Sequence, residues 1–199
     1  MLENVKQLTS HDKGRTFKVI QEHLQDLGYT IYTRVLNALD FGVPQKRERI
    51  FIVGFRDKIE FTWPTKTPRY KPLEEVLEND SEVDQSLFAS EKILKSRMEK
   101  CKKIPDYASI WHENKSGNIS ALPYSCALRA GASYNYLLVN GKRRPSGREM
   151  LRLQGFPESF KIVGPYTQIR KQAGNSVTVP VARAVAECLL FALDSNIQK

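Results

Sequence analysis

The residues with the clearest chemical potential form a charged string, "QKRER" at positions 45–49, directly before the apolar run 50–53. Arg47 and Arg49 carry planar guanidinium groups, which offer several fixed hydrogen-bond donors and keep their charge at neutral pH. Such groups can hold a phosphate or the carbonyl edge of a ligand. The same string is also typical of a solvated charge run at the start of a strand, and its residues alone do not separate the two interpretations.

A second candidate is Glu3, in "LENV" at 2–5, because a carboxyl held against a ligand can act as a general acid or base. Two further stretches combine glycine with charged, amide and hydroxyl side chains: "RPSGREMLRLQGFP" at 144–157 and "QAGNSV" at 172–177. Taken singly, each stretch is a weak signal. A glutamate near a chain terminus is usually solvated, and short polar residues before a helix often only cap it.

These residues need elements to position them, and the first 61 residues predict an α/β layer. Apolar residues recur at helical spacing over 13–27, with Ser10 or Asp12 as the expected start signal. The stretch 30–37 alternates like a half-buried strand, whereas 49–55 is apolar on both faces. A strand of the latter kind belongs inside a sheet that is covered on both sides.

The character of the sequence changes at Thr62, after which prolines recur. A charged helix is expected at about 90–100, with its lysines and arginine on a solvated face. The stretch 107–139 has no helical period and predicts short, irregular β-structure with exposed loops. A final helix with an apolar face is expected to end at about residue 193.

The composition limits the classes of partner. The chain has 199 residues and a formal net charge of +9, which favours a polyanion, nucleic acid before membrane. Its three cysteines are scattered, so we expect no metal site and no disulfide framework, and a reducing compartment fits. No apolar run approaches the roughly 18 residues of a membrane span, and no signal peptide is recognisable. We therefore expect a soluble, cytoplasmic protein.

Taken together, four stretches resemble one family. "LENV" (2–5) is similar to motif VI of the DNA cytosine-5 methyltransferases, and "QKRER" (45–49) is similar to motif VIII. The stretches 144–157 and 172–177 resemble motifs IX and X. The order and spacing of the four stretches also fit the family, and the resemblance covers nearly the whole chain. The segment 62–139 matches the family by its position between motifs and not by its residues. It is strongest to small bacterial restriction–modification enzymes.

The resemblance implies an α/β fold: the C-terminal part, from motif VI onward, of a Rossmann-like sheet domain that uses S-adenosylmethionine, with a smaller, irregular, β-rich target-recognition domain. The expected division is a partial catalytic domain over 1–61, a target-recognition domain over 62–139, a supporting segment with motif IX over 140–165, and motif X with a returning C-terminal helix over 166–199. The implied substrate is duplex DNA, in which a cytosine is swung out of the helix and methylated at C5.

The resemblance assigns catalytic roles to Glu3, Arg49 and Arg47. C5 of cytosine takes a methyl group only after a thiolate has added to C6, which requires protonation or hydrogen bonding on the N3 side of the ring. Glu3 is the implied carboxyl, since it can hold a proton and also accept from the exocyclic amine. Arg49 is expected to hold the carbonyl side of the base, and Arg47 to meet a phosphate or brace the pocket.

Asn175, Ser176 and Val177 are the implied cofactor residues. A tight backbone bend at Gly174, followed by the side chains and amides of "NSV", would close one wall of the S-adenosyl-L-methionine pocket. A helix cap by Asn175 or Ser176 is compatible with that role.

DNA contacts are expected from two places. The candidate base readers, in the glycine-flanked stretch 128–136, are Arg129, Ser133, Tyr134 and Asn135. Arginine favours guanine in the major groove, where a good bidentate pair contributes roughly 1–3 kcal/mol of discrimination. Lys142 and Arg143 are candidate phosphate contacts.

Motif IX is expected to organise the recognition region more than to contact DNA. Arg144, Arg148 and Arg152, with Glu149, recur at four-residue spacing and are predicted to share one helical face. The recognition region itself departs most from the family, which usually has Thr-Leu where this chain has Ala121-Leu122.

The implied nucleophile is not found in the sequence. In this family it lies in a Pro-Cys-Gln stretch upstream of motif VI, and none of Cys101, Cys126 and Cys188 has that context. The glycine-rich cofactor turn is not found either, so the cofactor pocket is expected to be only partly present. We expect a chain that is inactive alone, either a subunit of a split methyltransferase or a truncated product. Its expected partner is a polypeptide with the N-terminal part, or a second copy bound through the exposed sheet.

Two other functions remain open. One branch of the family modifies RNA, so an RNA cytosine-5 methyltransferase of the same fold is an alternative. The other alternative is a non-catalytic DNA-binding remnant that keeps the recognition region. Glu3, Arg49 and Asn175 argue against a remnant, which has no need of them.

Overall fold

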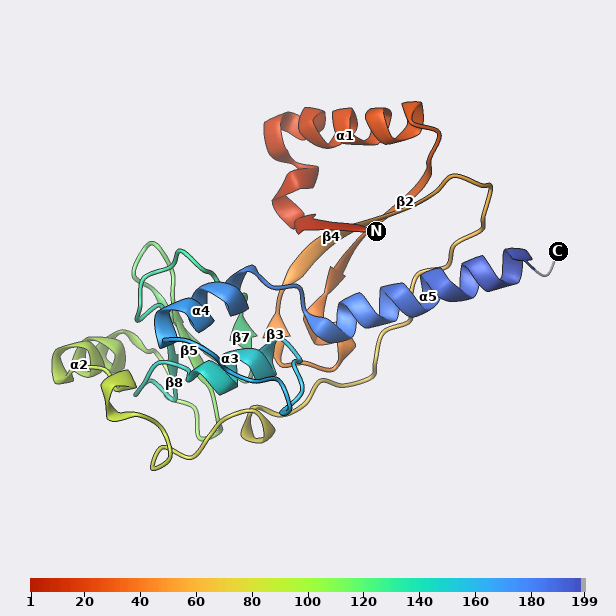
Figure 1. Cartoon of the computed structure of the whole chain (residues 1–199). Helices are drawn as coiled ribbons and strands as arrows, with labels where there is room; N and C mark the ends of the chain where they lie inside the picture. Colours follow the sequence, from red (N-terminus) through yellow and green to blue (C-terminus); the bar gives the residue numbers. More distant parts are fainter. Residues whose placement is uncertain (198–199) are drawn as a thin grey trace.

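The computed structural model describes residues 1–197 and contains two packed regions joined by several crossings of the chain (Figure 1). The strands are β1 (Leu2–Val5), β2 (Thr30–Asn37), β3 (Gln45–Lys46), β4 (Glu48–Phe55), β5 (Ile110–Glu113), β6 (Ile119–Leu122), β7 (Ser125–Cys126) and β8 (Leu137–Val139). The helices are α1 (Arg15–Asp26), α2 (Glu91–Lys100), α3 (Gly147–Leu153), α4 (Tyr166–Asn175) and α5 (Val179–Ile197). This mixture of helix and strand agrees with the predicted α/β class.

The first region is built on an antiparallel sheet in the order β1-β4-β2. β2 covers the predicted strand at 30–37, and β4 covers 48–55. Residues 50–53 of β4 are all buried, which confirms the prediction of a strand enclosed within the fold. Among the described residues β1 pairs with β4 alone, so the outer edge of β1 is unpaired.

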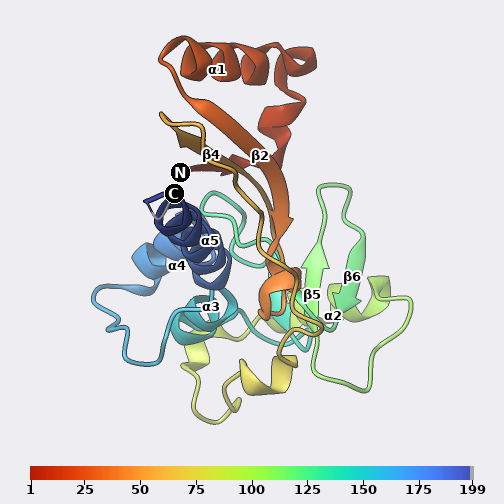
Figure 2. The same ribbon diagram turned by 90° about the vertical axis from the view of Figure 1, so that its right-hand side faces the viewer.

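The sheet lies between α1 and α5 (Figures 1 and 2). α5 packs Val181 and Val185 into a core cluster with Phe51 and Val53 of β4. α1 forms where the helical spacing predicted it, yet none of its residues is fully buried. Its start was predicted wrongly: the N-cap is Gly14, at a φ of +87°, and no side chain caps the helix.

The second region has a core of its own. Its sheet has the order β6-β5-β8, and β3 pairs in parallel with β7. The core cluster draws its buried residues from 73–153 and from Ala173, whereas the first cluster draws on 36–61 and 181–192. This separation agrees with the change of character at Thr62. The exact limits of the predicted domains remain a prediction.

Two charged stretches differ from their predictions. α2 lies at 91–100 as expected, but Arg97 is buried, because its guanidinium pairs with Glu113 at 2.6 Å. α3 begins at Gly147 after a capping box between Ser146 and Glu149, so Arg144 lies outside the helix. The four-residue spacing therefore did not place all of the motif IX side chains on one helical face.

The C-terminal helices also correct an expectation. Within the described residues one stretch, Tyr166–Asn196, is by length and composition apolar enough to cross a membrane. It combines α4 and α5, and α5 packs into the core beside β4. The core helix of a soluble protein has the same composition, so this stretch is weak evidence for a membrane span.

Candidate functional site

Glu3 and Arg49 lie together on one face of the first sheet. Glu3 is opposite Phe51 in the β1–β4 register, and Arg49 lies two residues before Phe51. Directly opposed residues share a face, as do alternate residues of one strand, so both side chains point to the same side. Glu3 Oε1 lies 3.2 Å from Arg49 Nε, and the side chains are 21% and 17% exposed. The register thus joins two residues that are 46 positions apart.

The Glu3–Arg49 pair is unsaturated, which means that some of its hydrogen-bond donors and acceptors have no partner. Glu3 Oε1 is buried but has no hydrogen-bond partner, because its short contact with Arg49 is not aligned as a hydrogen bond. Arg49 donates from Nη1 to the carbonyl oxygen of Glu48 at 2.8 Å. Burial lowers the pKa of Arg49, and the charge of Glu3 acts in the opposite direction. A carboxylate oxygen and part of a guanidinium therefore have no hydrogen-bond partner among the described residues, and together they match a ligand that has a donor beside an acceptor.

Arg47 points into the protein and joins three segments. Its guanidinium donates to the carbonyl oxygens of Leu128 at 3.0 Å, Gly174 at 3.2 Å and Ser176 at 2.7 Å. The residue is only 3% exposed. Burial, and then the charge of Arg49, lower the pKa of Arg47 to about 10, so it stays charged at neutral pH. Of the two expected roles, phosphate contact and bracing, this geometry fits bracing.

Two buried glutamines complete the junction, and sequence analysis assigned no role to either. Gln45 accepts from the Leu128 amide at 3.0 Å and donates to the Leu153 carbonyl at 2.8 Å. Gln154 donates to the Ala173 carbonyl at 2.6 Å. Both glutamines are 0% exposed, and a buried amide requires such partners. The sequence did contain one signal for this role. Gln154 is a polar residue that continues the helical spacing of the buried apolar residues of α3.

Residues 174–177 connect α4 to α5 in a way that differs from expectation. Asn175 is the last residue of α4 and Ser176 is its C-cap, so neither is the N-cap of α5. Gly174 is helical and makes no tight bend. A Cβ at Gly174 would lie 2.4 Å from the backbone nitrogen of Ala130, so glycine is needed here for close approach of the Arg129–Ala130 backbone.

Val177 lies beside the arginines of 45–49. A cavity of about 10 Å³ is lined by Leu36, Arg47, Arg49, Phe51, Val177, Thr178 and Val181. The cavity is too small for a ligand, but it shows that the segments resembling motifs VIII and X meet. A much larger cavity, about 980 Å³, is lined by residues of 58–65 and α5, and no candidate site residue borders it.

The family follows from comparison with known proteins. A family model described as "C-5 cytosine-specific DNA methylase" matches residues 1–190. The chain belongs to this family. It is 61% identical over 198 residues to the Type II methyltransferase M.NgoBI of Neisseria gonorrhoeae, and 57% identical over 199 residues to M.HaeII of Haemophilus aegyptius. These matches cover 98% and 100% of this chain but 62% and 63% of the relatives, so the chain spans less than two thirds of their length.

Solved methyltransferase structures share the fold. The S. pombe Dnmt2 methyltransferase aligns with a TM-score of 0.70 at 19% identity, over 96% of this chain and 66% of that one. The Entamoeba histolytica methyltransferase EhMeth aligns with a TM-score of 0.67 at 17% identity, over 96% and 62%. The sheet and the smaller β-rich region therefore belong to a methyltransferase fold, as the sequence resemblance implied.

In this member of the DNA methylase family, the candidate base readers share one loop. Arg129, Ser133 and Tyr134 are exposed, and Asn135 is half-buried. The Arg129 guanidinium lies over the ring of Tyr136, with Cζ 4.8 Å from the ring centroid. The carbonyl of Asn135 accepts from Arg97 at 3.0 Å. The loop is thus anchored in the protein while several of its side chains face solvent.

The two candidate phosphate contacts differ. Lys142 is exposed, with only a distant ion pair to Asp80 at 3.8 Å. Arg143 is 0% exposed and forms a two-pronged pair with Glu149, at 2.8 and 2.9 Å. Although burial lowers it, hydrogen bonds to Glu149 and Asp80 raise the pKa of Arg143 above its ordinary value. Arg143 has no free surface for DNA, so its expected role does not fit the structure.

None of the three cysteines borders the cavity beside Arg49. Cys101 caps the end of α2, Cys126 lies in β7, and Cys188 packs on the first core from α5. Burial raises the pKa of the Cys126 and Cys188 thiols, which disfavours the nucleophilic thiolate.

Proposed function

We propose that this chain is the base-binding and DNA-recognition part of a DNA cytosine-5 methyltransferase. The observation that carries the proposal is the unsaturated Glu3–Arg49 pair, at 3.2 Å. A cytosine presents an exocyclic amine, N3 and a carbonyl oxygen in a row. A carboxyl that donates a proton to N3 and accepts from the amine, beside a guanidinium that donates to the carbonyl, matches this edge.

In the proposed reaction a thiolate forms a bond to C6 of the extruded cytosine. The displaced electron pair moves towards N3, where protonated Glu3 supplies a proton. Arg49 holds the carbonyl oxygen and stabilises negative charge that develops on it. C5 can then take the methyl group. Loss of the C5 proton to solvent water, release of the thiolate from C6 and return of the N3 proton to Glu3 then restore the aromatic ring.

S-adenosyl-L-methionine supplies the methyl group when it is bound. In this chain the exposed Asn175, the half-buried Ser176 and Val177 stand at the junction of α4 and α5. Their amide, hydroxyl and apolar groups fit one wall of a polar cofactor site. Arg47 positions this wall, since it donates to the carbonyl oxygens on both sides of Asn175.

We further propose that a polypeptide segment outside these 199 residues supplies the nucleophile and the rest of the cofactor site. The support is that the chain spans 62% of its M.NgoBI relative and that no cysteine borders the cavity beside Arg49. The partner would bind the unpaired edge of β1, where Leu2 and Val5 are 53% and 43% exposed. A strand added there would pair the free backbone groups of the edge. Because the relatives are bacterial, the cytoplasm of a bacterium is the proposed location.

The test is transfer of labelled methyl groups to duplex DNA. We expect no transfer by the purified chain and transfer when a polypeptide with the Pro-Cys-Gln and glycine-rich motifs is co-expressed. Transfer by the chain alone would overturn the need for a partner. Folded RNA, offered in parallel, separates the RNA alternative: preferred methylation of RNA would overturn the choice of DNA as substrate.

A further inference from the structure

A ladder of alternating arginines and tyrosines crosses the second region. Its members, in spatial order, are Arg129, Tyr136, Arg170, Tyr134, Arg144 and Tyr166. The distances from each guanidinium carbon to the neighbouring ring centroids are 4.8, 5.9, 4.7, 5.5 and 5.6 Å along the ladder. Each is within the range of a cation–π contact. The ladder joins the loop of the candidate base readers to α4 and to the segment before α3.

Arg170 is the central rung and holds the loop in two ways. Its guanidinium contacts Tyr134 and Tyr136, and it also donates to the carbonyl oxygens of Ala132 and Ser133, the latter at 3.0 Å. A planar guanidinium can stack and donate at once, which a lysine cannot do. The backbone of the loop is thereby fixed from one residue of α4.

The ends of the loop are fixed separately. At Leu128 the backbone is bound by Gln45 and Arg47. The Arg129 amide donates to the Tyr136 hydroxyl at 2.9 Å, which closes the loop on itself. Arg129 is exposed, and its guanidinium lies over the Tyr136 ring with no hydrogen bond to any other described residue, so its donor groups are available at the end of the ladder.

We propose that Arg170 is a positioning residue for DNA sequence readout, holding the loop so that Arg129 presents its guanidinium edge to a base. This inference rests on the proposed DNA-binding function. Tyr134, a candidate base reader, instead helps to hold the loop, because the guanidinium groups of Arg144 and Arg170 both lie against its ring. The same helix contains Gly174, one residue before its end, against which the Arg129–Ala130 backbone packs, so α4 links the reading loop to the proposed cofactor wall.

The test compares Arg170→Met with Lys171→Met in the full chain. Both variants remove one positive charge from neighbouring positions of α4, and Lys171 is exposed. Sequence readout is measured by selection from a pool of randomised duplexes, and loop order by hydrogen exchange of the amides at 130–136. Thermal unfolding checks that each variant folds.

We expect Arg170→Met to speed exchange in the loop on the order of tenfold or more. It should also reduce discrimination between the selected duplex and random duplex by roughly tenfold or more. Lys171→Met should lower affinity for both duplexes equally and leave exchange unchanged. Arg170→Lys keeps the charge but not the planar guanidinium. It should retain affinity for duplex DNA but not discrimination between the selected and random duplexes.

Equal behaviour of Arg170→Met and Lys171→Met would overturn the inference. So would faster loop exchange with an unchanged selected sequence, since the loop would then not read DNA. If the parent chain selects no duplex at all, the proposed DNA-binding function fails and the readout role fails with it. Hydrogen exchange would still report whether Arg170 orders the loop, so the two failures are distinguishable.

Discussion

Among the Arg–Glu pairs of the molecule, one in each region differs most in its surroundings: Arg143–Glu149 and Arg49–Glu3. Arg143 and Glu149 are both 0% exposed, and the pair is two-pronged at 2.8 and 2.9 Å. Arg143 also donates to Asp80 at 2.7 Å and to the Glu78 carbonyl at 2.9 Å. Glu3 and Arg49 touch solvent, and one buried carboxylate oxygen has no hydrogen-bond partner. The first pair is saturated and the second is not.

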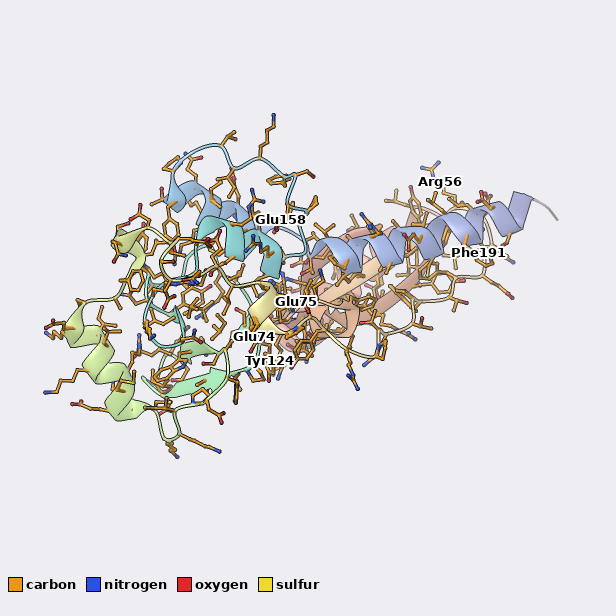
Figure 3. All side chains as sticks on the ribbon, turned by 90° about the horizontal axis from the view of Figure 1, so that it is seen from below. Arg56, Glu74, Glu75, Tyr124, Glu158 and Phe191 are labelled. Carbon is orange, nitrogen blue, oxygen red and sulfur yellow. The ribbon has the colours of Figure 1, made fainter. Side chains whose placement is uncertain are left out.

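The difference indicates which pair is structural. A buried charge needs all of its partners inside the protein, so a saturated pair has nothing left to offer a ligand. An unsaturated pair at a partly exposed position keeps donors and acceptors for a molecule that arrives later. Figure 3 shows side chains tipped with nitrogen or oxygen along much of the molecule, the labelled Arg56, Glu74 and Glu158 among them, so a charged side chain does not by itself identify a site. Saturation distinguishes these two pairs where sequence did not.

The largest effect on stability is expected from breaking the saturated pair. Arg143→Met would leave Glu149 buried without its partner, and the free energy of unfolding should fall by about 3–5 kcal/mol. Urea unfolding followed by circular dichroism measures the change. Lys142→Met is the matched control, because it removes the same charge from the exposed neighbouring residue and should stay within about 0.5 kcal/mol of the parent. Equal stability of the two variants would contradict the assignment.

A second variant tests the contact between the regions. Gly174→Ala would push a methyl group against Ala130 and Arg129, at 2.4 and 2.8 Å, and should cost about 1–3 kcal/mol of unfolding free energy by overpacking. Gly131→Ala in the adjacent loop meets nothing within 4 Å. An equally small effect of both substitutions would show that the loop is not held against α4.

For the unsaturated pair, stability and function should respond differently. Glu3→Gln should change the free energy of unfolding by less than about 1 kcal/mol, because the pair is partly exposed. With a complementing polypeptide present, methyl transfer should fall by about 10²–10⁴-fold, since the proton donor is lost. Glu22→Gln on the exposed face of α1 is the control. Unchanged methyl transfer by the Glu3 variant would remove the proposed catalytic role.

The smallest effect is expected from a pair that is more exposed than either of these. Lys6 and Glu48 are 3.1 Å apart, with side chains 49% and 38% exposed. Lys6→Met should cost about 0.2–1 kcal/mol, and added salt should remove most of the difference between variant and parent. A larger loss of unfolding free energy that does not depend on salt would mean that solvent exposure does not predict how much each pair contributes to stability.

The sequence predicted elements whose signals are local. The alternation at 30–37, the apolar run at 49–55 and the helical spacing before Gly28 each correspond to an observed element. The start of α1 was missed, because Gly14 caps it through a left-handed backbone and not through a side chain. Helix boundaries that depend on backbone geometry leave a weak trace in composition.

The candidate site was predicted in part. Motif order pointed to Glu3 and Arg49, and the strand register then placed them 3.2 Å apart. Lys142 and Arg143 looked alike in sequence, but Asp80 and Glu149 drew only Arg143 into the interior. Likewise Arg47 and Arg49 alternate along one string, and one became a brace while the other remained partly open. Identical side chains acquired different roles from partners distant in the chain.

The sequence by itself determined the family, the α/β class and the position of the main strands and helices, because these depend on spacing between neighbouring residues. The tertiary structure alone decided which arginines are buried, which carboxylate lacks a partner and which loop is held by α4. Those properties depend on desolvation and on hydrogen bonds between segments up to 129 positions apart, as between Arg47 and Ser176. No local pattern encodes them, since a charge has the same letter whether it is solvated or enclosed.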